Sequence, residues 1–281
     1  MSVPVPSMDT EPAPLRLKPH EDRRLRAGHL WVFSNEVDVG RTPLTEFAPG
    51  QVVRIEASGG RPLGTGYVNP HSLICARIVS RDPNRTPDRS LLVHRLKVAL
   101  ALRRRLYSEP CYRLVHGEGD GLPGLVVDRY GDVLVVQITT AGMERLREEV
   151  LAALRKVIAP SGVLLRNDGP IRALEGLDRY VEVAEGEVPE EAEVVENGVR
   201  FLAPLRDGQK TGWYYDQREN RARLASLAAG RSVLDLFSYV GAWGIQAAVA
   251  GAERVMCVDS ASRALDRVAG NARRNGVGER V

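Results

Sequence analysis

Between residues 232 and 275 the chain alternates short apolar strands with helices, and this alternation constrains the fold more than any other feature. We expect strands at 232–236 and 254–258, and helices at about 241–250 and 262–275. Two strands joined through a helix usually run parallel in one sheet, because the helix carries the chain back to the starting edge. The segment therefore predicts the opening of a doubly wound α/β sheet.

The loop after the first of these strands carries candidate ligand-binding residues. In VLDLFSYVGAWG, Asp235 ends the strand and Gly241 opens the helix, and ligands in such folds bind at the carboxyl ends of strands. Asp259 ends the second strand, where a carboxylate can accept hydrogen bonds from both hydroxyls of a ribose. This spacing suits a dinucleotide or S-adenosylmethionine. The pattern G-x-G-x-x-G is absent, and residues 237–240 stand where a pyrophosphate needs bare backbone, which favours S-adenosylmethionine. A βαβ core with a helix-packing glycine is the alternative.

The segment GQKTGWYYDQRENR, at 208–221, precedes this unit. Asp216 and Glu219 have the spacing of a capping box at the start of a helix expected from about Gln217 to Ala229. Arg218 near that positive helix end could bind the carboxylate of S-adenosylmethionine. The alternative makes Arg218 and Arg221 surface charges.

The rest of the chain divides by composition and pattern. Prolines dominate the first residues, short apolar runs with turn signals follow, and a central part combines a hairpin with an amphipathic helix at 143–158. Seven glutamates between Glu182 and Glu196 predict a solvated linker or exposed hairpin. Asn197-Gly198 predicts a hairpin turn. The expected parts are a flexible tail at 1–14, a β-barrel at 15–83, a central α+β domain at 84–190, and an incomplete α/β domain at 191–281.

Charge and cysteine content narrow the function classes. The net charge is +3, distributed as +6 over 1–110, −7 over 111–200 and +4 over 201–281. Arginine supplies 35 of the 39 cations, which suits phosphate contacts, although a coding bias toward arginine explains the count as well. No stretch has the roughly 18 uninterrupted apolar residues of a membrane span. Three separated cysteines without C-x-x-C spacing support neither a disulfide framework nor a zinc site. We expect a cytoplasmic protein without a membrane partner.

A resemblance to a known family becomes specific at this point. DGQKTGWYYDQRENR, VLDLFSYVGAWGIQAA and VDSASRAL resemble the three-part ribosomal RNA cytosine-5 methyltransferase family. LRLKPHEDRRLRAGHLWVFSNEV and YRLVHGEGDGLPGLVVDRYGDVLVVQ extend the resemblance over nearly all residues after 14. It implies a multidomain α+β and α/β fold: an N-terminal PUA-like β-barrel, a β-rich central domain and a partial Rossmann-like class I methyltransferase domain.

The resemblance also implies site residues. S-adenosylmethionine is the expected cofactor, and the residues expected around it are Asp235, Phe237, Gly241, Asp259, Lys210, Tyr214, Gln217 and Arg218. Ribosomal RNA is the expected partner, and a homodimer is a further hypothesis. The PUA-like region should dock RNA, and local charge density points to phosphate contacts by Lys18, Arg23, Arg24 and Arg26.

The catalytic half of the site is not found. Methylation at C5 of cytosine needs a nucleophile that adds to C6, and the family uses a cysteine thiolate. Cys75, Cys111 and Cys257 all lie in or beside apolar strands and do not fit this role. The family's Asp-Pro-Pro motif and later cysteine segment are also absent, so the catalytic residues are expected beyond Val281 and this chain alone is expected to be inactive. An RNA-binding protein without methyl transfer and a small-molecule methyltransferase are the alternatives.

Overall fold

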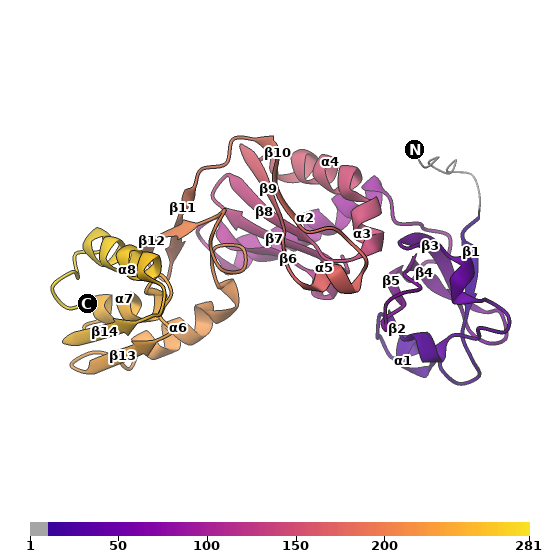
Figure 1. Ribbon diagram of the computed structural model, residues 1–281, viewed down its shortest axis with the longest axis horizontal. Helices are drawn as coiled ribbons and strands as arrows, with labels where there is room; N and C mark the ends of the chain where they lie inside the picture. The colour runs from indigo at the N-terminus through magenta and orange to yellow at the C-terminus, as the bar shows by residue number, and fades with distance from the viewer. Residues whose placement is uncertain (1–10) are drawn as a thin grey trace.

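The computed structural model describes residues 11–281, which form three units in chain order along the long axis of the molecule (Figure 1). The predicted combination of α+β and α/β parts is confirmed. None of the helices in the described part of the chain has the length and apolar character to cross a membrane.

The first unit is a five-stranded sheet with the order β1-β3-β4-β5-β2. Its strands are β1 (Ala13–Arg16), β2 (Trp31–Val32), β3 (Gln51–Glu56), β4 (Pro62–Val68) and β5 (Ala76–Ser80). The short helix α1 (Arg23–Arg26) follows β1. The predicted tail is wrong at its end, because Ala13 and Pro14 pair with β3, while residues 1–10 lie outside the described part.

The second unit is a mixed sheet with the order β10-β9-β8-β7-β6. Its strands are β6 (Cys111–His116), β7 (Leu125–Tyr130), β8 (Val133–Ile138), β9 (Gly162–Asn167) and β10 (Tyr180–Gly186). Its helices are α2 (Arg89–Leu106), α3 (Ala141–Arg145), α4 (Arg147–Ile158) and α5 (Ile171–Leu174). The helix predicted at 143–158 is therefore two helices, because Leu146 leaves the helical region at φ −95° and ψ 11°.

Buried polar contacts fix the first unit to the second. The Glu175 carboxylate pairs with Arg77 at 3.2 Å and accepts a hydrogen bond from Asn69 Nδ2 at 2.8 Å. Gly142 leaves space for the Tyr67 ring, since a Cβ there would lie 1.9 Å from it. The Tyr67 hydroxyl donates to the carbonyl of Pro123 at 2.7 Å. The glycine-rich loop 116–124 thus forms part of this junction.

The third unit begins with the hairpin of β11 (Glu191–Glu196) and β12 (Val199–Pro204). Its turn is Asn197-Gly198, as predicted, with φ of 54° and 79°. The parallel strands β13 (Ser232–Leu236) and β14 (Arg254–Val258) have their predicted bounds. The helices are α6 (Arg218–Ala225), α7 (Ala242–Val249) and α8 (Ser262–Arg274).

The second and third units share a hydrophobic core. Val135 and Leu164 from the central sheet belong to the same buried cluster as Phe201 of β12 and Trp213. The expected boundary near residue 190 therefore crosses a continuous apolar core. The second and third units therefore pack against each other through this shared core.

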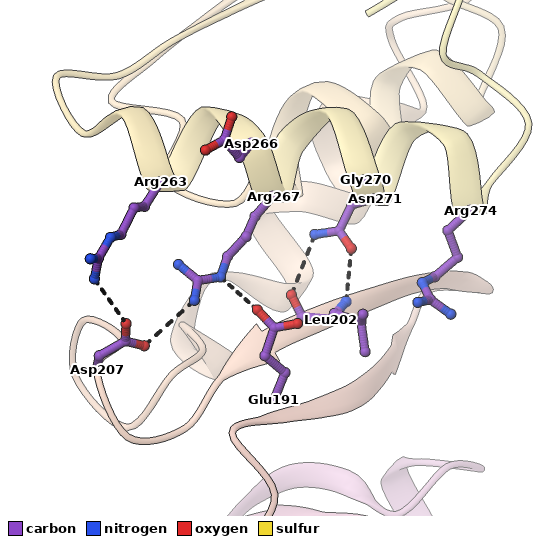
Figure 2. A pocket seen from close by; sticks show the side chains of 9 residues that line it. All are labelled: Glu191, Leu202, Asp207, Arg263, Asp266, Arg267, Gly270, Asn271 and Arg274. Carbon is purple, nitrogen blue, oxygen red and sulfur yellow. Dashed lines mark hydrogen bonds and ion pairs between the residues drawn. The ribbon is translucent and has the colours of Figure 1, made fainter.

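Two asparagines cover the exposed edge of β12: Asn271 on α8, whose bonds to Leu202 are drawn in Figure 2, and Asn275, directly after the end of α8. Asn271 accepts from the Leu202 N–H at 2.8 Å and donates to the Leu202 carbonyl at 3.4 Å. Asn275 makes the same pair of bonds to Arg200, at 3.0 and 2.6 Å. One turn of a helix and two residues of a strand have similar lengths. Asn271 and Asn275, four residues apart in the sequence, can therefore hydrogen-bond to the backbone of two strand residues that are two apart. The free edge is thereby satisfied.

We expect Asn271→Ala to lower the free energy of unfolding by about 2 kcal/mol, because it leaves buried backbone groups of β12 without partners. The measurement is the urea midpoint followed by tryptophan fluorescence. Asn220→Ala is the control, since Asn220 is a helical asparagine whose side chain makes only a solvent-exposed hydrogen bond, to Gln217 at 3.0 Å, and serves no strand edge. Equal midpoints for the two variants would contradict the edge-covering role of Asn271.

Candidate cofactor site

A cavity of about 450 Å³ lies where β13 and β14 end. Three segments contribute to it: the stretch before and into α6, the loop after β13, and the residues after β14. The lining residues are Gln209, Lys210, Trp213, Tyr214, Asp216, Gln217, Arg221, Phe237, Ser238, Tyr239, Ala242, Trp243, Asp259 and Ser260. This is the position in which an open α/β sheet binds its ligand.

Backbone strain is concentrated around this cavity. Six non-glycine residues in the described part have positive φ, and three of them, Lys210, Phe237 and Tyr239, line the cavity. Such conformations cost free energy and are kept mainly at functional sites. The Phe237 side chain is also 90% exposed, which is unusual for an aromatic ring on a folded loop. The strain therefore marks this cavity as the candidate site.

Tyr239 joins the loops on the two sides of the cavity. Its hydroxyl donates to the Gly212 carbonyl and accepts from the Gln209 N–H, each at 3.2 Å. Its own N–H donates to Asp259 Oδ2 at 2.9 Å. Burial raises the pKa of the Tyr239 phenol to about 12, so the hydroxyl remains protonated and able to donate at neutral pH.

Lys210 closes the outer side of the same wall. Its ammonium lies 3.1 Å from Asp216 Oδ2 and 4.1 Å from the centre of the Tyr214 ring. Burial, the largest single cause, would raise the pKa of Asp216, but the hydrogen bond and the charge of Lys210 together with a hydrogen bond from Gln217 outweigh it, so the pKa is lowered. The predicted capping box is wrong, since α6 begins at Arg218 after Gln217, without a side-chain cap, while Asp216 pairs with Lys210.

A buried carboxylate supports the inner wall. Glu196, at the end of β11, accepts from Arg221 Nε at 2.6 Å, Trp213 Nε1 at 2.9 Å and Gln246 Nε2 at 3.0 Å. Glu196 and Arg221 are both buried, and Trp213 and Arg221 line the cavity. The expectation of a solvated glutamate run is wrong at Glu196, because this residue occupies an inward-facing position of the strand.

The structure brings five of the eight expected cofactor residues to the cavity: Lys210, Tyr214, Gln217, Phe237 and Asp259. Asp235 lies behind it, buried, and accepts a hydrogen bond from the Gly244 N–H at 3.0 Å in the first turn of α7. Burial raises the pKa of Asp235, and the bond from Gly244 opposes that rise. Asp235 thus shapes the loop and helix that border the cavity.

Gly241 and Arg218 also lie outside the cavity lining. Gly241 has φ 81°, and a Cβ there would lie 2.9 Å from Ile245 and 3.1 Å from Val268, so the missing side chain serves helix packing rather than the approach of a ligand. Arg218 donates to the Cys111 carbonyl at 3.0 Å and stacks on the Tyr107 ring. Its guanidinium is therefore directed toward the second unit, because tertiary contacts override its position at a helix start.

Sequence reasoning missed much of the lining, including Trp213, Ser238, Tyr239 and Trp243. Trp213 and Tyr239 lie within the two motifs, and their aromatic character was a usable signal. The sequence placed Arg221 only as a surface charge, whereas it pairs with Glu196. That partner is 25 residues earlier in the chain, so spacing alone could not reveal it.

The four expected RNA-contact residues lie on or near α1, far along the chain from the cavity. Arg24 contacts Glu36 at 3.2 Å, Arg26 pairs with Asp22, and Lys18 Nζ donates to the Asn35 carbonyl at 2.7 Å. Arg23 is exposed and makes no ion pair within residues 11–281. The cluster is therefore basic, with part of its charge already balanced.

A second cavity of about 460 Å³ lies between α8 and the hairpin, as Figure 2 shows. Its cations already have partners: Arg267 contacts Glu191 at 2.8 Å and Asp207 at 3.5 Å, and Arg263 contacts Asp207 at 3.9 Å. The side chain of Asn271 is hydrogen-bonded to the backbone of Leu202 on β12. The charged groups of this cavity are thus paired with one another between α8 and the hairpin, so few of them are left to bind a ligand.

Comparisons with known families agree with the geometry. A family model described as S-adenosylmethionine-dependent methyltransferase matches residues 112–280, more than half of the chain. This chain belongs to that family. A PUA-like domain model matches residues 15–81, which include all of the first unit except the first two residues of β1.

Similar proteins match most of the length of this chain. The ribosomal RNA large subunit methyltransferase I of Aeromonas salmonicida is 39% identical over 261 residues, covering 91% of this chain and 65% of that protein. The protein of the same name from Aliivibrio fischeri strain ES114 is 38% identical, covering 90% and 64%. The chain thus spans about 65% of the length of these curated relatives.

Solved structures give the same fold. A SAM-dependent methyltransferase structure from Streptococcus mutans superposes with a TM-score of 0.78 at 25% identity, covering 94% of this chain and 68% of that one. Another methyltransferase, solved in complex with SAH, gives a TM-score of 0.79 at 26% identity, covering 94% and 67%.

The residues of the first cavity fit S-adenosylmethionine, the cofactor of the family. Asp259 offers a carboxylate for ribose hydroxyls, and aromatic rings offer faces for adenine. Ser238 is only 3% exposed, and its Oγ has no hydrogen-bond partner in the described part of the chain. A buried hydroxyl without a partner beside a cavity is suited to a polar ligand group.

We expect S-adenosylhomocysteine at 100 times its Kd to stabilise the chain by about 2.7 kcal/mol, since it binds only the folded state. Asp259→Ala should reduce this stabilisation, because the ribose loses its carboxylate partner. The measurement is the thermal midpoint with and without the ligand. Asp266→Ala, which removes an exposed carboxylate of α8 in the same unit, is the control and should keep the full shift. Equal shifts in both variants would remove Asp259 from the site.

Proposed function

We propose that this protein is an S-adenosylmethionine-dependent methyltransferase of large-subunit ribosomal RNA. The observation that carries the proposal is the similarity to ribosomal RNA large subunit methyltransferase I over 91% of the chain, the PUA-like unit included. A methyltransferase of small molecules has no evident need for such a unit. An RNA-binding protein without cofactor is the alternative, and a missing response to S-adenosylhomocysteine would support it.

S-adenosylmethionine supplies an electrophilic methyl group on a sulfonium. The chain's own residues would bind and orient it: Asp259 would accept from the ribose, Ser238 would bond a polar group, and Trp243 and Tyr214 would cover apolar faces. Lys210 and Asp216 would close the outer wall. Together these groups would hold the methyl in place for an incoming RNA base.

We further propose C5 of a cytosine as the methylated atom, on the resemblance of the motifs at 207–221 and 233–248 to the cytosine-5 family. That chemistry needs a cysteine thiolate. None of the three cysteines lines the cavity. Burial raises the pKa of each thiol, to about 12 for Cys75 and Cys257, so thiolate is scarce at neutral pH.

We therefore expect the 281-residue chain alone to transfer no methyl group to ribosomal RNA above background. The measurement is incorporation of labelled methyl from S-adenosylmethionine, run beside a binding assay that shows the cofactor bound. Turnover that survives replacement of all three cysteines by serine would exclude the thiolate mechanism for this chain. Turnover lost only on Cys257→Ser would assign that thiol as the nucleophile.

We expect charge reversal at Arg23, Arg24 and Arg26 to weaken binding to large-subunit ribosomal RNA and to reduce the slope of log K against log salt by roughly 2 to 3, because each lost phosphate contact releases about one counterion fewer. The measurement is a salt titration of the affinity. Replacement of the same three residues by lysine keeps the charges and should keep most of the slope. An unchanged slope after reversal would place the RNA contacts elsewhere.

A further inference from the structure

One wall of the cofactor cavity is held from outside its own unit. The segment from Leu205 to Gln217 supplies six of the lining residues: Gln209, Lys210, Trp213, Tyr214, Asp216 and Gln217. It forms no helix or strand before Tyr215. Its backbone position therefore depends on side-chain contacts, which come both from Tyr239, Glu196 and Arg221 of its own unit and from the central sheet.

Thr211 makes the most buried of these contacts. Its Oγ1 donates to Asp128 Oδ2 on β7 at 2.5 Å, and both residues are fully buried. The same carboxylate receives Arg113 Nε and Nη2 from β6, each at 2.9 Å. The Tyr130 hydroxyl donates to the Thr211 carbonyl at 3.0 Å. Thr211 is thus fixed at both its side chain and its backbone by one sheet.

Further contacts from the sheet hold the two ends of the segment. Arg166 of β9 donates to the Leu205 carbonyl at 2.5 Å and to the Gly208 carbonyl at 3.0 Å. At the other end the Tyr215 hydroxyl donates to the Arg129 carbonyl at 2.9 Å. Two strands of the central sheet, β7 and β9, therefore hold this irregular segment at its beginning, middle and end.

The contacts from the central sheet also hold the backbone beside the cavity in place. Lys210, next to Thr211, has φ 53°, a conformation that persists only where surrounding contacts impose it. Trp213 and Tyr214 follow within three residues. If the anchors were lost, the segment would sample other conformations and would have to be ordered again when the cofactor binds, which costs affinity.

We propose that Thr211 is a positioning residue for S-adenosylmethionine, and that the central sheet, through Asp128, sets the affinity of the cofactor site. The inference rests on the assignment of that cofactor to the cavity. Thr211 does not line the cavity, so its effect passes through the neighbouring residues that do. The central domain then has a share in the cofactor site in addition to joining the other two units.

Paired substitutions separate this role from a purely structural one. Thr211→Val keeps the shape and removes the hydroxyl, whereas Thr211→Ser keeps the hydroxyl. Thr140→Val is the matched control, because Thr140 is also buried, and its Oγ1 donates to the Tyr67 hydroxyl at 3.0 Å at the junction of the first two units. For each protein we would measure the Kd of S-adenosylhomocysteine by calorimetry and the thermal midpoint without ligand.

We expect Thr211→Val to weaken binding about tenfold, in line with the loss of a hydrogen bond to a charged group. Thr211→Ser should restore most of the affinity. Thr140→Val should lower the thermal midpoint and leave the Kd unchanged. Wild-type affinity in Thr211→Val would overturn the inference and leave the proposed function standing. No binding by the wild-type chain would overturn the assignment of the cofactor and this inference with it.

A second variant covers the case in which Thr211→Val does not fold. Tyr130→Phe removes the donor to the Thr211 carbonyl and leaves the ring packed in the core. We expect a Kd several-fold weaker than that of the wild-type chain. An unchanged Kd would contradict the inference that contacts from the central sheet to residues 205–217 set the affinity of the cofactor site.

Discussion

The cofactor side of this molecule depends on one buried ion pair. Glu196 and Arg221 have almost no contact with solvent, and each also satisfies a further neighbour, Trp213 for the first and the Tyr214 carbonyl for the second. Gln246 brings α7 to the same carboxylate. Removing one partner of such a pair leaves an uncompensated charge in the core, typically at a cost of about 3–5 kcal/mol. The hairpin, α6, α7 and the cavity wall therefore share one point of support.

The three units are joined by contacts of the same kind. Glu175 of the second unit pairs with Arg77 of the first, and Asp128 of the second, paired with Arg113 in its own sheet, accepts a hydrogen bond from Thr211 of the third. Each junction buries a carboxylate that has a hydrogen-bond partner across the boundary. Buried polar groups with fixed partners tolerate little relative displacement. The position of the PUA-like unit relative to the cofactor cavity is thus fixed by contacts within the chain.

The elements that could be predicted from the sequence are those determined by local pattern. The bounds of β13 and β14 follow from compact apolar runs. The turn at Asn197-Gly198 follows from the two residue types themselves, which readily adopt the positive φ that the turn requires. Phe237 and Asp259 reach the cavity because strand ends fix them. Arg218 could not be placed, since its partner carbonyl lies 107 residues earlier, at Cys111. The helix at 143–158 was predicted as one because periodicity does not register a single residue leaving the helical region.

The pattern of β11 contained a signal for the buried site. In this strand Ala192 and Val194 face inward, and Glu196 continues their alternation. A charged residue in line with core positions requires a buried partner, because burying an unpaired charge is prohibitive. Three residues of the motif at 208–221 carry cations, and α6 brings one of them, Arg221, to that position. The buried carboxylate of Glu196 therefore makes Arg221 as necessary to the fold as the apolar contacts around it. Because Arg221 also lines the cavity, the same ion pair supports the site.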